Sequence, residues 1–559
     1  MLFEYVAPGH SATSQSLSAE TVWSPFPLQP LSPGTLTHFS YSVLAELAAR
    51  AWYLHYDRLG FDPTPRSHVV RRHKGHVYFN VSLPAQLEAQ HAALEPPSLR
   101  LNGEHHALAA WEKPGFLAGF KSGRAQKKID DTLAEYERQM PATTEKARAW
   151  YQKTQSIKRW GQAEVLQIME EIERVGVESM VAFLASRLNL GRHYARLVAN
   201  IAAHHGSTPT QAALSINHAL CDISGLVELN MLKALPDLAA SFADPAAKAW
   251  LQAGSYSSWR SEVPNAAALE QLKHFMDGYG HRAMHEGEIA LPRWSEEPAL
   301  LMAAILAHAQ GSESAAPKAP ASSGKADQLL AALPSSMRKQ GEQSLQKIAE
   351  LHQLQSHALH ALAYIWAGTR SWALAAAREA MVDKRLQSVD EVFLFELEEI
   401  KQLMTGEWNV SSREEIHALT ATRRAEQATL REDTAPDLLV GNREAFIASS
   451  DNSSNSYSGT GSVAGKASGA LVCLPKSAAH QVRGVIVATE LLDSGSAIAL
   501  PFAAGFVAAQ GSPYDPFVAA ALAYQHPVVV RVGKAFAELK DGVMTSVEVS
   551  SDSARVSQE

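Results

Sequence analysis

The sequence predicts a multidomain protein in which a large, mainly α-helical domain is followed by a small α/β domain. A chain of 559 residues is too long to fold around one hydrophobic core. Over most of the first 440 residues, apolar side chains recur at three- or four-residue steps, which indicates amphipathic helices. From residue 463 onward the pattern changes to short apolar runs, which are typical of strands.

The N-terminal part is expected to be extended before regular helix begins. Residues 1–20 are predicted to form an extended segment, and the closely spaced prolines from Pro25 to Pro33 continue this tendency because proline lacks a backbone donor. Apolar periodicity predicts the first helix over 36–59. Alternation of apolar and polar residues predicts a strand or hairpin over 76–82.

Residues 21–440 are predicted to form the mainly helical domain. Alanine, leucine and glutamate dominate 117–306, and long amphipathic patterns cover 336–381 and 414–431. Residues 311–327 lack periodicity and are rich in Ser, Ala, Pro and Gly, which predicts a mobile surface loop. Most tryptophans and tyrosines of this domain are expected in its core, although such side chains can also line an apolar ligand pocket.

The polar residues of 441–462 predict a linker, followed by the small domain over 463–549 and a tail over 550–559. In this domain, apolar runs of strand length alternate with one helical stretch, which makes it α/β. The strands are expected at 470–474, 485–489, 504–508 and 528–532, and the helix at 515–524.

Charge and composition exclude several classes of partner. A net charge of −8 and a pI near 6.3 provide no basic field for nucleic acid or for an anionic membrane surface. The sequence contains no long apolar segment and no export signal, so we expect a soluble protein. Cys221 and Cys473 lie too far apart to suggest a metal motif or a disulfide framework, and we expect a cytoplasmic location.

Several stretches of the chain resemble PEP-utilising enzymes, the family that includes rifampicin phosphotransferase. In the C-terminal domain these are GTGSVAGKASGALV, VRGVIVATELLDSG, LPFAAGFVAAQG and ALAYQHPVVVRVGKAFAELKDGVMTSVEV. They resemble the mobile domain, which implies a swivelling domain of the phosphohistidine type. Earlier stretches resemble the family's substrate-binding domain and the helices leading out of it: Trp23 with PLSP, YGHR with PRW, DEVF and RRAE.

Two departures from the family pattern bear on function. An ATP-grasp domain charges the histidine in such enzymes, and we expect none within this chain, so ATP would act only through a separate partner. Alignment on the family motif puts Pro516 where the phosphate-carrying histidine stands. Proline has no ring nitrogen to phosphorylate, while its fixed φ suits the first turn of a helix. The resemblance therefore implies a retained scaffold without the carrier function.

The strongest cluster of candidate residues follows the YGHR motif. Arg282 and Arg293 flank Glu286 and Glu288, and guanidinium groups can bind phosphate or a polar substrate in bidentate fashion. We interpret Arg282, Glu288 and Arg293 as substrate-binding candidates, and His281, Arg282 and Glu286 as candidate catalytic residues. The four-residue spacing of Arg282 and Glu286 would place both on one helical face. A structural salt-bridge network explains the same residues equally well.

Other histidines offer weaker candidates. His281 and His285 are four residues apart, but no third ligand is evident, so we predict no metal site. His357 lies on a helix with His352, Gln355 and His360, where rifampicin phosphotransferases present a basic pair that is missing from this sequence. These histidines could serve as acid or base in a remodelled pocket or simply form a polar helix face.

His526 lies near the position of the missing carrier. It could replace that nucleophile, but its place before the apolar run 528–532 favours a structural role.

Three functions are compatible with these features. The first is a divergent, phosphotransfer-deficient relative, a pseudoenzyme for the family reaction, that binds a small organic molecule as an accessory or remodelled enzyme in a biosynthetic or modification system. The second is a phosphotransferase or ligase subunit that works with a separate ATP-grasp polypeptide. The third is a regulatory partner of an intact family enzyme. No cofactor bound by this chain is predicted.

Overall fold

The computed structural model describes residues 2–4, 20–65, 67–101, 104–110, 116–156, 162–220, 223–309, 324–405, 413–432, 435–446, 455–474 and 483–559. Most of the predicted extended segment 1–20 and of the predicted loop 311–327, together with Cys221, lies outside the described residues. Contacts divide the chain into two compact units. Unit one contains residues 1–189, 287–291 and 357–447, and unit two contains 190–286, 292–356 and 448–559.

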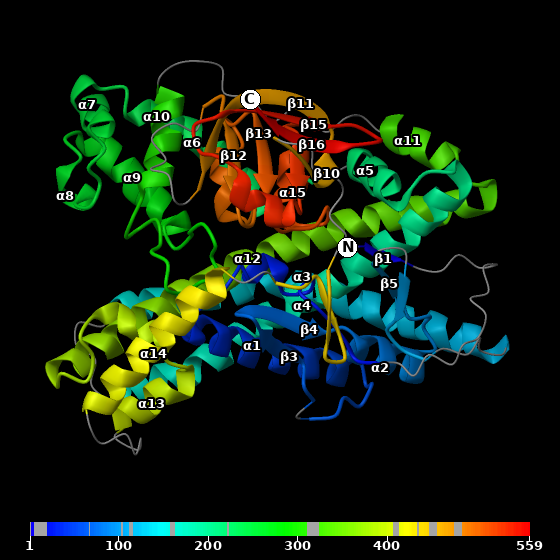
Figure 1. Ribbon diagram of the computed structural model, residues 1–559, viewed down its shortest axis with the longest axis horizontal. Coiled ribbons are helices and arrows are strands. Elements are labelled where there is room, and N and C mark those ends of the chain that lie inside the picture. Colours follow the sequence, from blue (N-terminus) through cyan, green and yellow to red (C-terminus); the bar gives the residue numbers. More distant parts are fainter. Residues whose placement is uncertain are drawn as a thin grey trace. The chain divides into compact units, whose positions relative to one another are not determined.

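The predicted fold class is confirmed: helices form most of the structure and an α/β domain follows them (Figure 1). Two long helices, α4 (Gln162–His205) and α12 (Ser335–Val382), each contribute residues to both units. None of the helices in the described part of the chain is both long and apolar enough to cross a membrane.

Unit one is built on helices and two small sheets. Its first long helix, α1 (His38–Arg58), confirms the predicted helix 36–59 and begins at Thr37, whose side chain accepts from the Ser40 amide. The remaining helices are α2 (Ser82–Ala92), α3 (Phe116–Ser156), α13 (Leu397–Thr405) and α14 (Arg413–Glu432). Trp52, Trp366 and Trp372 are buried in this unit, as expected for core aromatics.

The larger sheet of unit one has the order β3-β4-β2-β7-β8, and the smaller has the order β1-β5-β6. The predicted strand or hairpin at 76–82 is β4, which pairs antiparallel with β3. The strands of the larger sheet are β2 (Val22–Ser24), β3 (Val70–His73), β4 (His76–Asn80), β7 (Leu438–Val440) and β8 (Arg443–Ala445). Those of the smaller are β1 (Leu2–Glu4), β5 (Ser98–Leu101) and β6 (Glu104–Ala107).

Unit two combines short helices with the C-terminal α/β domain. The helix α5 begins with a capping box in which Thr208 and Gln211 satisfy each other's backbone amides. The helices before the C-terminal domain are α5 (Pro209–Ala219), α6 (Val227–Ser241), α7 (Pro245–Ala253), α8 (Trp259–Glu262), α9 (Ala266–Tyr279), α10 (Ala299–Ala309) and α11 (Gly324–Ala331).

The C-terminal domain contains an eight-stranded sheet with the order β10-β14-β13-β12-β11-β15-β16-β9. The four predicted strands correspond to β11 (Gly465–Cys473), β12 (Ile486–Thr489), β13 (Gly505–Ala508) and β14 (Val528–Val530), which pair in parallel. The helix α15 (Pro516–Leu522) connects β13 to β14. β12, β13 and β14 are buried along their whole length, which explains their uninterrupted apolar sequence.

The sheet extends beyond the predicted domain limits at both ends. β9 (Ser456–Ser458) and β10 (Thr460–Val463) form within the stretch predicted as linker, and β16 (Ala554–Gln558) forms within the predicted tail, beyond β15 (Met544–Val549). The Ser, Thr and Gly residues of β9 and β10 show no apolar alternation. Their strand conformation depends on pairing with β16 and β14, which a local sequence pattern does not reveal.

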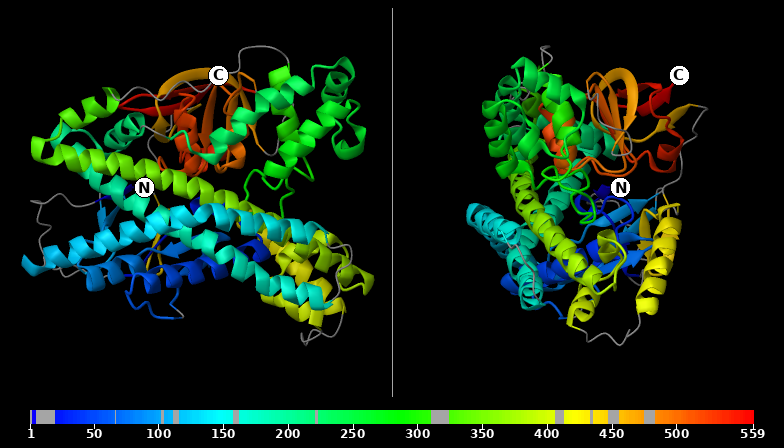
Figure 2. Two further views of the ribbon diagram at one scale, coloured as in Figure 1. Left: turned by 180° about the vertical axis from the view of Figure 1, so that it is seen from behind. Right: turned by 90° about the vertical axis from the view of Figure 1, so that its left-hand side faces the viewer.

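One hydrophobic core in unit two joins the helices to the C-terminal domain. It contains side chains of α6, α9 and α10 together with side chains of β12, β13, β14 and α15. The short helix η3 (Gly495–Ala499) contacts both α6 and α10. The orange and red strands lie beside the green helices in both views of Figure 2. In this structure the α/β domain is therefore packed against helices through apolar surface.

Candidate functional site

The segment after α9 that contains the YGHR motif is a series of turns and not a helix. Gly280 fits here because a Cβ atom would lie 2.5 Å from the carbonyl oxygen of Met276. The Trp294 amide donates to the Arg282 carbonyl at 2.8 Å, and His285 has a positive φ of 56°. The expectation that Arg282 and Glu286 share a helical face is therefore wrong, because the backbone reverses direction between them.

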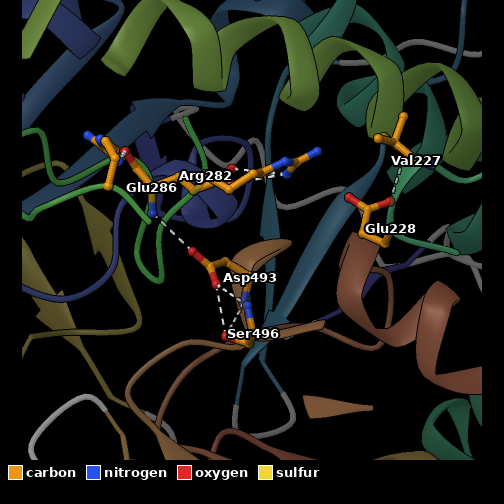
Figure 3. A network of polar contacts seen from close by, with 8 residues as sticks. Val227, Glu228, Arg282, Glu286, Asp493 and Ser496 are labelled. Atoms are coloured by element: carbon orange, nitrogen blue, oxygen red, sulfur yellow. Dashed lines mark hydrogen bonds and ion pairs between the residues drawn. The ribbon is translucent and has the colours of Figure 1, made fainter. Parts of the chain in front are cut away.

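Arg282 and Glu286 nevertheless form an ion pair inside unit two. The Arg282 Nη1 atom lies 3.1 and 3.3 Å from the two carboxylate oxygens of Glu286, and both side chains are buried (Figure 3). Arg293 is also buried, and its Nη1 donates to the Glu286 carbonyl at 3.1 Å. Three predicted site residues are thus brought together.

Asp493, which lies in the loop before η3 of the C-terminal domain, completes this network. Its Oδ2 accepts from the Glu286 amide at 3.0 Å, and its Oδ1 accepts from the amide and the hydroxyl of Ser496 at 3.0 and 2.8 Å (Figure 3). A Cβ atom on Gly495 would lie only 1.7 Å from the Ala283 carbonyl oxygen. Glycine is therefore required where this loop meets the turn segment.

The charges in this network perturb one another. Burial raises the pKa of Glu286 to about 7, and the negative charge of Asp493 acts in the same direction, while Arg282 and Arg293 oppose it. Burial disfavours the charged form of Arg282, but the carboxylates of Glu286 and Glu228 hold its pKa above the ordinary value. A carboxyl group with a pKa near neutrality can exchange a proton under physiological conditions.

Glu288 belongs to a different network in unit one. Its carboxylate accepts from the Thr37 amide at 2.8 Å, the Thr37 hydroxyl at 2.9 Å and the Ser40 hydroxyl at 2.6 Å, and also from the Ala290 amide at 2.9 Å. These contacts surround the N-terminus of α1, where a carboxylate is favoured by the helix dipole. Glu288 therefore has the contacts of a structural helix cap.

The candidate histidines occupy separate places. His281 is buried next to Arg282, and the Nε2 atom of His285 lies 2.9 Å from the Thr489 hydroxyl. His357 is half-buried on α12 in the part that belongs to unit one. Within the described ranges of the chain, no three His, Cys, Asp or Glu side chains are arranged to hold a metal ion.

Pro516 is the first residue of α15 and is buried, which fits the helix-starting role expected of it. In the loop before it, the Asp515 carboxylate accepts from the Ser512 amide at 2.7 Å. His526 follows α15 and lies beside the rings of Tyr524 and Phe506, with ring centroids 6.2 and 6.4 Å apart. These aromatic contacts match the structural role considered for His526.

The loop before Pro516 is held by residues of α4 and α5 that the sequence interpretation did not single out. The Asn217 amide nitrogen donates to the carbonyls of Pro513 and Ser462 at 3.1 and 3.0 Å. The ring of Tyr514 packs on the ring of Tyr194 with centroids 4.0 Å apart, and the Tyr194 hydroxyl donates to Asn217 Oδ1 at 2.6 Å. No local sequence signal identifies the contacts of Asn217 with Ser462 and Pro513, because these residues are 245 and 296 positions away.

Two family models match the chain. The model for the fourth domain of rifampicin phosphotransferase matches residues 177–364, and the model for the mobile domain of PEP-utilising enzymes matches residues 481–553. These matches support a PEP-utilising, phosphotransferase-like protein, in agreement with the resemblance seen in its motifs. Together the two matches support a family like that of the PEP-utilising enzymes and rifampicin phosphotransferase. No curated protein matches it.

Proposed function

We propose that this chain is a phosphotransferase-like protein that does not carry phosphate at position 516. In this proposal it binds a small organic molecule in unit two and acts as an accessory or remodelled enzyme in a biosynthetic or modification system. We also propose a cytoplasmic location, on the basis of its two widely spaced cysteines.

The observation that carries this proposal is the environment of Pro516. A phosphate carrier needs a nucleophilic side chain that can leave one site and reach another. The side chain at this position has no nucleophilic atom, and it is buried at the start of α15. The preceding loop is attached to Asn217 and Tyr194, which supports a docked, binding role for the domain over a carrier role.

The binding part of the proposal is supported by the buried polar groups of unit two. Arg282, Glu286 and Asp493 keep charge in an interior where unpaired charge is costly, and arrangements of this kind occur at ligand sites as well as in structural networks. Native mass spectrometry of the full chain, purified without denaturation, tests for a retained small molecule. A thermal-shift screen of metabolites tests for one that has been lost, because a ligand specific to the folded state raises Tm.

The second candidate function is a phosphotransferase or ligase subunit that receives phosphate from a separate ATP-grasp polypeptide. The family matches favour it, and His526 is the histidine near the carrier position. The His526→Ala variant separates the two functions. If a partner-dependent phosphorylation of the chain exists and this substitution abolishes it, the carrier function has moved to His526 and our leading proposal fails.

A further inference from the structure

Glu228 carries a buried carboxylate oxygen whose hydrogen-bonding capacity is unused. The residue lies in the first turn of α6 and is 1% exposed. Its Oε2 atom accepts from the Ser356 hydroxyl, which itself accepts from the Val227 amide at 2.9 Å. Its Oε1 atom is buried and has no hydrogen-bond partner among the residues that the structure describes. A buried carboxylate oxygen in this state is costly unless another molecule supplies a donor.

Gln355 shows the same deficit on the neighbouring helix. It is 0% exposed on α12, and neither its amide oxygen nor its amide nitrogen has a partner within the described part of the chain. An amide side chain offers both a donor and an acceptor, and buried amides are normally hydrogen-bonded. The Gln355 amide can therefore donate one hydrogen bond to a bound molecule and accept another from it.

Gln355 lies on a polar face of α12 that Glu228 contacts from α6. In α12, residues three and four positions apart lie on the same side, so His352, Gln355 and Ser356 share a face. Ser356 contacts Glu228, and His352 Nε2 lies 3.4 Å from the hydroxyl of Tyr194. The neighbours of Gln355 on this face, Ser356 and His352, thus contact Glu228 and Tyr194 respectively. Tyr194 also packs on the loop before Pro516.

The start of α6 lies directly against this part of α12. A Cβ atom on Gly225 would meet the side chain of Gln353 at 3.1 Å. The start of α6 is therefore close to α12 at Gly225 as well as at the hydrogen bond between Glu228 and Ser356.

The local charge favours a cation. Arg282 extends toward Glu228 from the side of Glu286 (Figure 3). Arg293, which donates to the Glu286 carbonyl, is the second guanidinium in the network. The carboxylates of Glu228 and Asp493 balance these two guanidinium groups while Glu286 is protonated, and ionisation of Glu286 gives the network one negative charge in excess. An ammonium group balances that charge and donates up to three hydrogen bonds.

We propose that Glu228 and Gln355 form a buried site for a small molecule that bears a protonated primary amine. The ammonium group donates to Glu228 Oε1 and to the Gln355 amide oxygen, and the Gln355 amide nitrogen donates to a hydroxyl or carbonyl on the same molecule. This inference rests on the proposed function and names the class of ligand for it. An anionic ligand is disfavoured at this position because the carboxylate would repel it.

Ethanolamine is the probe for this site, because it is a small primary amine with a neighbouring hydroxyl group. The apparent Tm of the full chain is measured over a concentration series at constant ionic strength. We expect Tm to rise with ethanolamine concentration. We expect no rise with ethylene glycol, which lacks the charge, or with tetramethylammonium, which lacks N–H donors.

Two variants connect the effect to the site. Glu228→Gln removes the charge and Gln355→Met removes both polar atoms with little change in volume, and each should abolish the rise in Tm. Glu342→Gln, an exposed change on the same helix, should leave the rise intact. Where a variant does not fold, the structure of wild-type crystals soaked in ethanolamine shows whether the amine binds at Glu228. The ammonium nitrogen is expected within hydrogen-bond distance of Glu228 Oε1.

The inference is overturned by an unchanged Tm with ethanolamine, by an equal rise with tetramethylammonium, or by ordered water alone beside Glu228 in soaked crystals. The same protein preparations are assayed for acid-labile phosphate. Phosphorylation of the wild-type chain contradicts the proposed function, whatever ethanolamine does. If the chain carries no phosphate and its Tm does not respond to ethanolamine, the proposed amine ligand is wrong and the proposed function still stands.

Discussion

Asp493 should be essential for the junction between the C-terminal domain and the turn segment of unit two. Its carboxylate accepts three hydrogen bonds, from the Glu286 amide and from both the amide and hydroxyl of Ser496. The residue is 5% exposed, so water cannot readily replace the lost acceptor. Asp493→Ala therefore leaves two backbone N–H groups buried without their partner.

The size of the effect follows from these contacts. Each of the two stranded backbone donors costs about 1–3 kcal/mol, which predicts a total loss of about 2–6 kcal/mol for Asp493→Ala. Loss of the negative charge offsets part of this cost, because Asp493 disfavours ionisation of the neighbouring Glu286. Asp493→Asn keeps one acceptor oxygen and nearly the same volume, so its cost should be about half as large.

Urea unfolding measures the loss, and hydrogen exchange with mass spectrometry locates it. In Asp493→Ala, peptides covering 280–286 and 493–500 should exchange faster. Asp552→Ala is the control, because Asp552 is exposed in the same unit and accepts from Gln211. This change should cost less than about 1 kcal/mol. An Asp493→Ala chain that is as stable as the Asp552→Ala chain would refute the reasoning.

Three further predictions follow from the remaining networks. Glu286 is favoured in its protonated form, since its folded pKa is raised from 4.5 to about 7, so its contribution to stability is complete below about pH 4.5 and is lost as the pH rises through 7. Glu286→Gln should remove about 3 kcal/mol of pH dependence from urea unfolding over that interval, and an unchanged pH profile would contradict it. Glu288→Ala should cost about 2–4 kcal/mol, because Thr37 and Ser40 lose their common acceptor; a loss equal to that of an exposed glutamate substitution would count against the cap. Asn217→Ala should speed hydrogen exchange in 510–517 while leaving the strands of the C-terminal sheet protected, and unchanged exchange in that loop would show that Asn217 does not hold it.

The sequence predicts the helices and strands correctly where the local apolar periodicity is strong. The amphipathic pattern of α12 and the apolar runs of β12, β13 and β14 have a clear period and a clear change of period. β9, β10 and β16 could not be predicted from the sequence. Most of their residues are polar or small, and they form strands because partners from elsewhere in the chain complete their hydrogen bonds.

The candidate site was only partly accessible for a related reason. The motif identified Arg282, Glu286 and Arg293 as a group, but the four-residue spacing of Arg282 and Glu286 suggested a helix where the chain turns. Asp493 lies 207 residues from Glu286, and no single sequence reveals such a pair. Glu228 likewise depends on Ser356, 128 residues away. Tertiary packing selects these partners, so they become visible only in the folded chain.

The central claim is that the chain cannot carry phosphate at the family position. The most direct measurement is the amount of acid-labile phosphate on the full chain after incubation with ATP and an isolated ATP-grasp domain of a PEP-utilising enzyme. The Pro516→His variant is measured in parallel, because it restores a nucleophile at the start of α15. We predict no acid-labile phosphate on the wild-type chain. Acid-labile phosphate on the Pro516→His variant would show that the ATP-grasp domain recognises this scaffold. Acid-labile phosphate on the wild-type chain at the level of one group per molecule would contradict the claim.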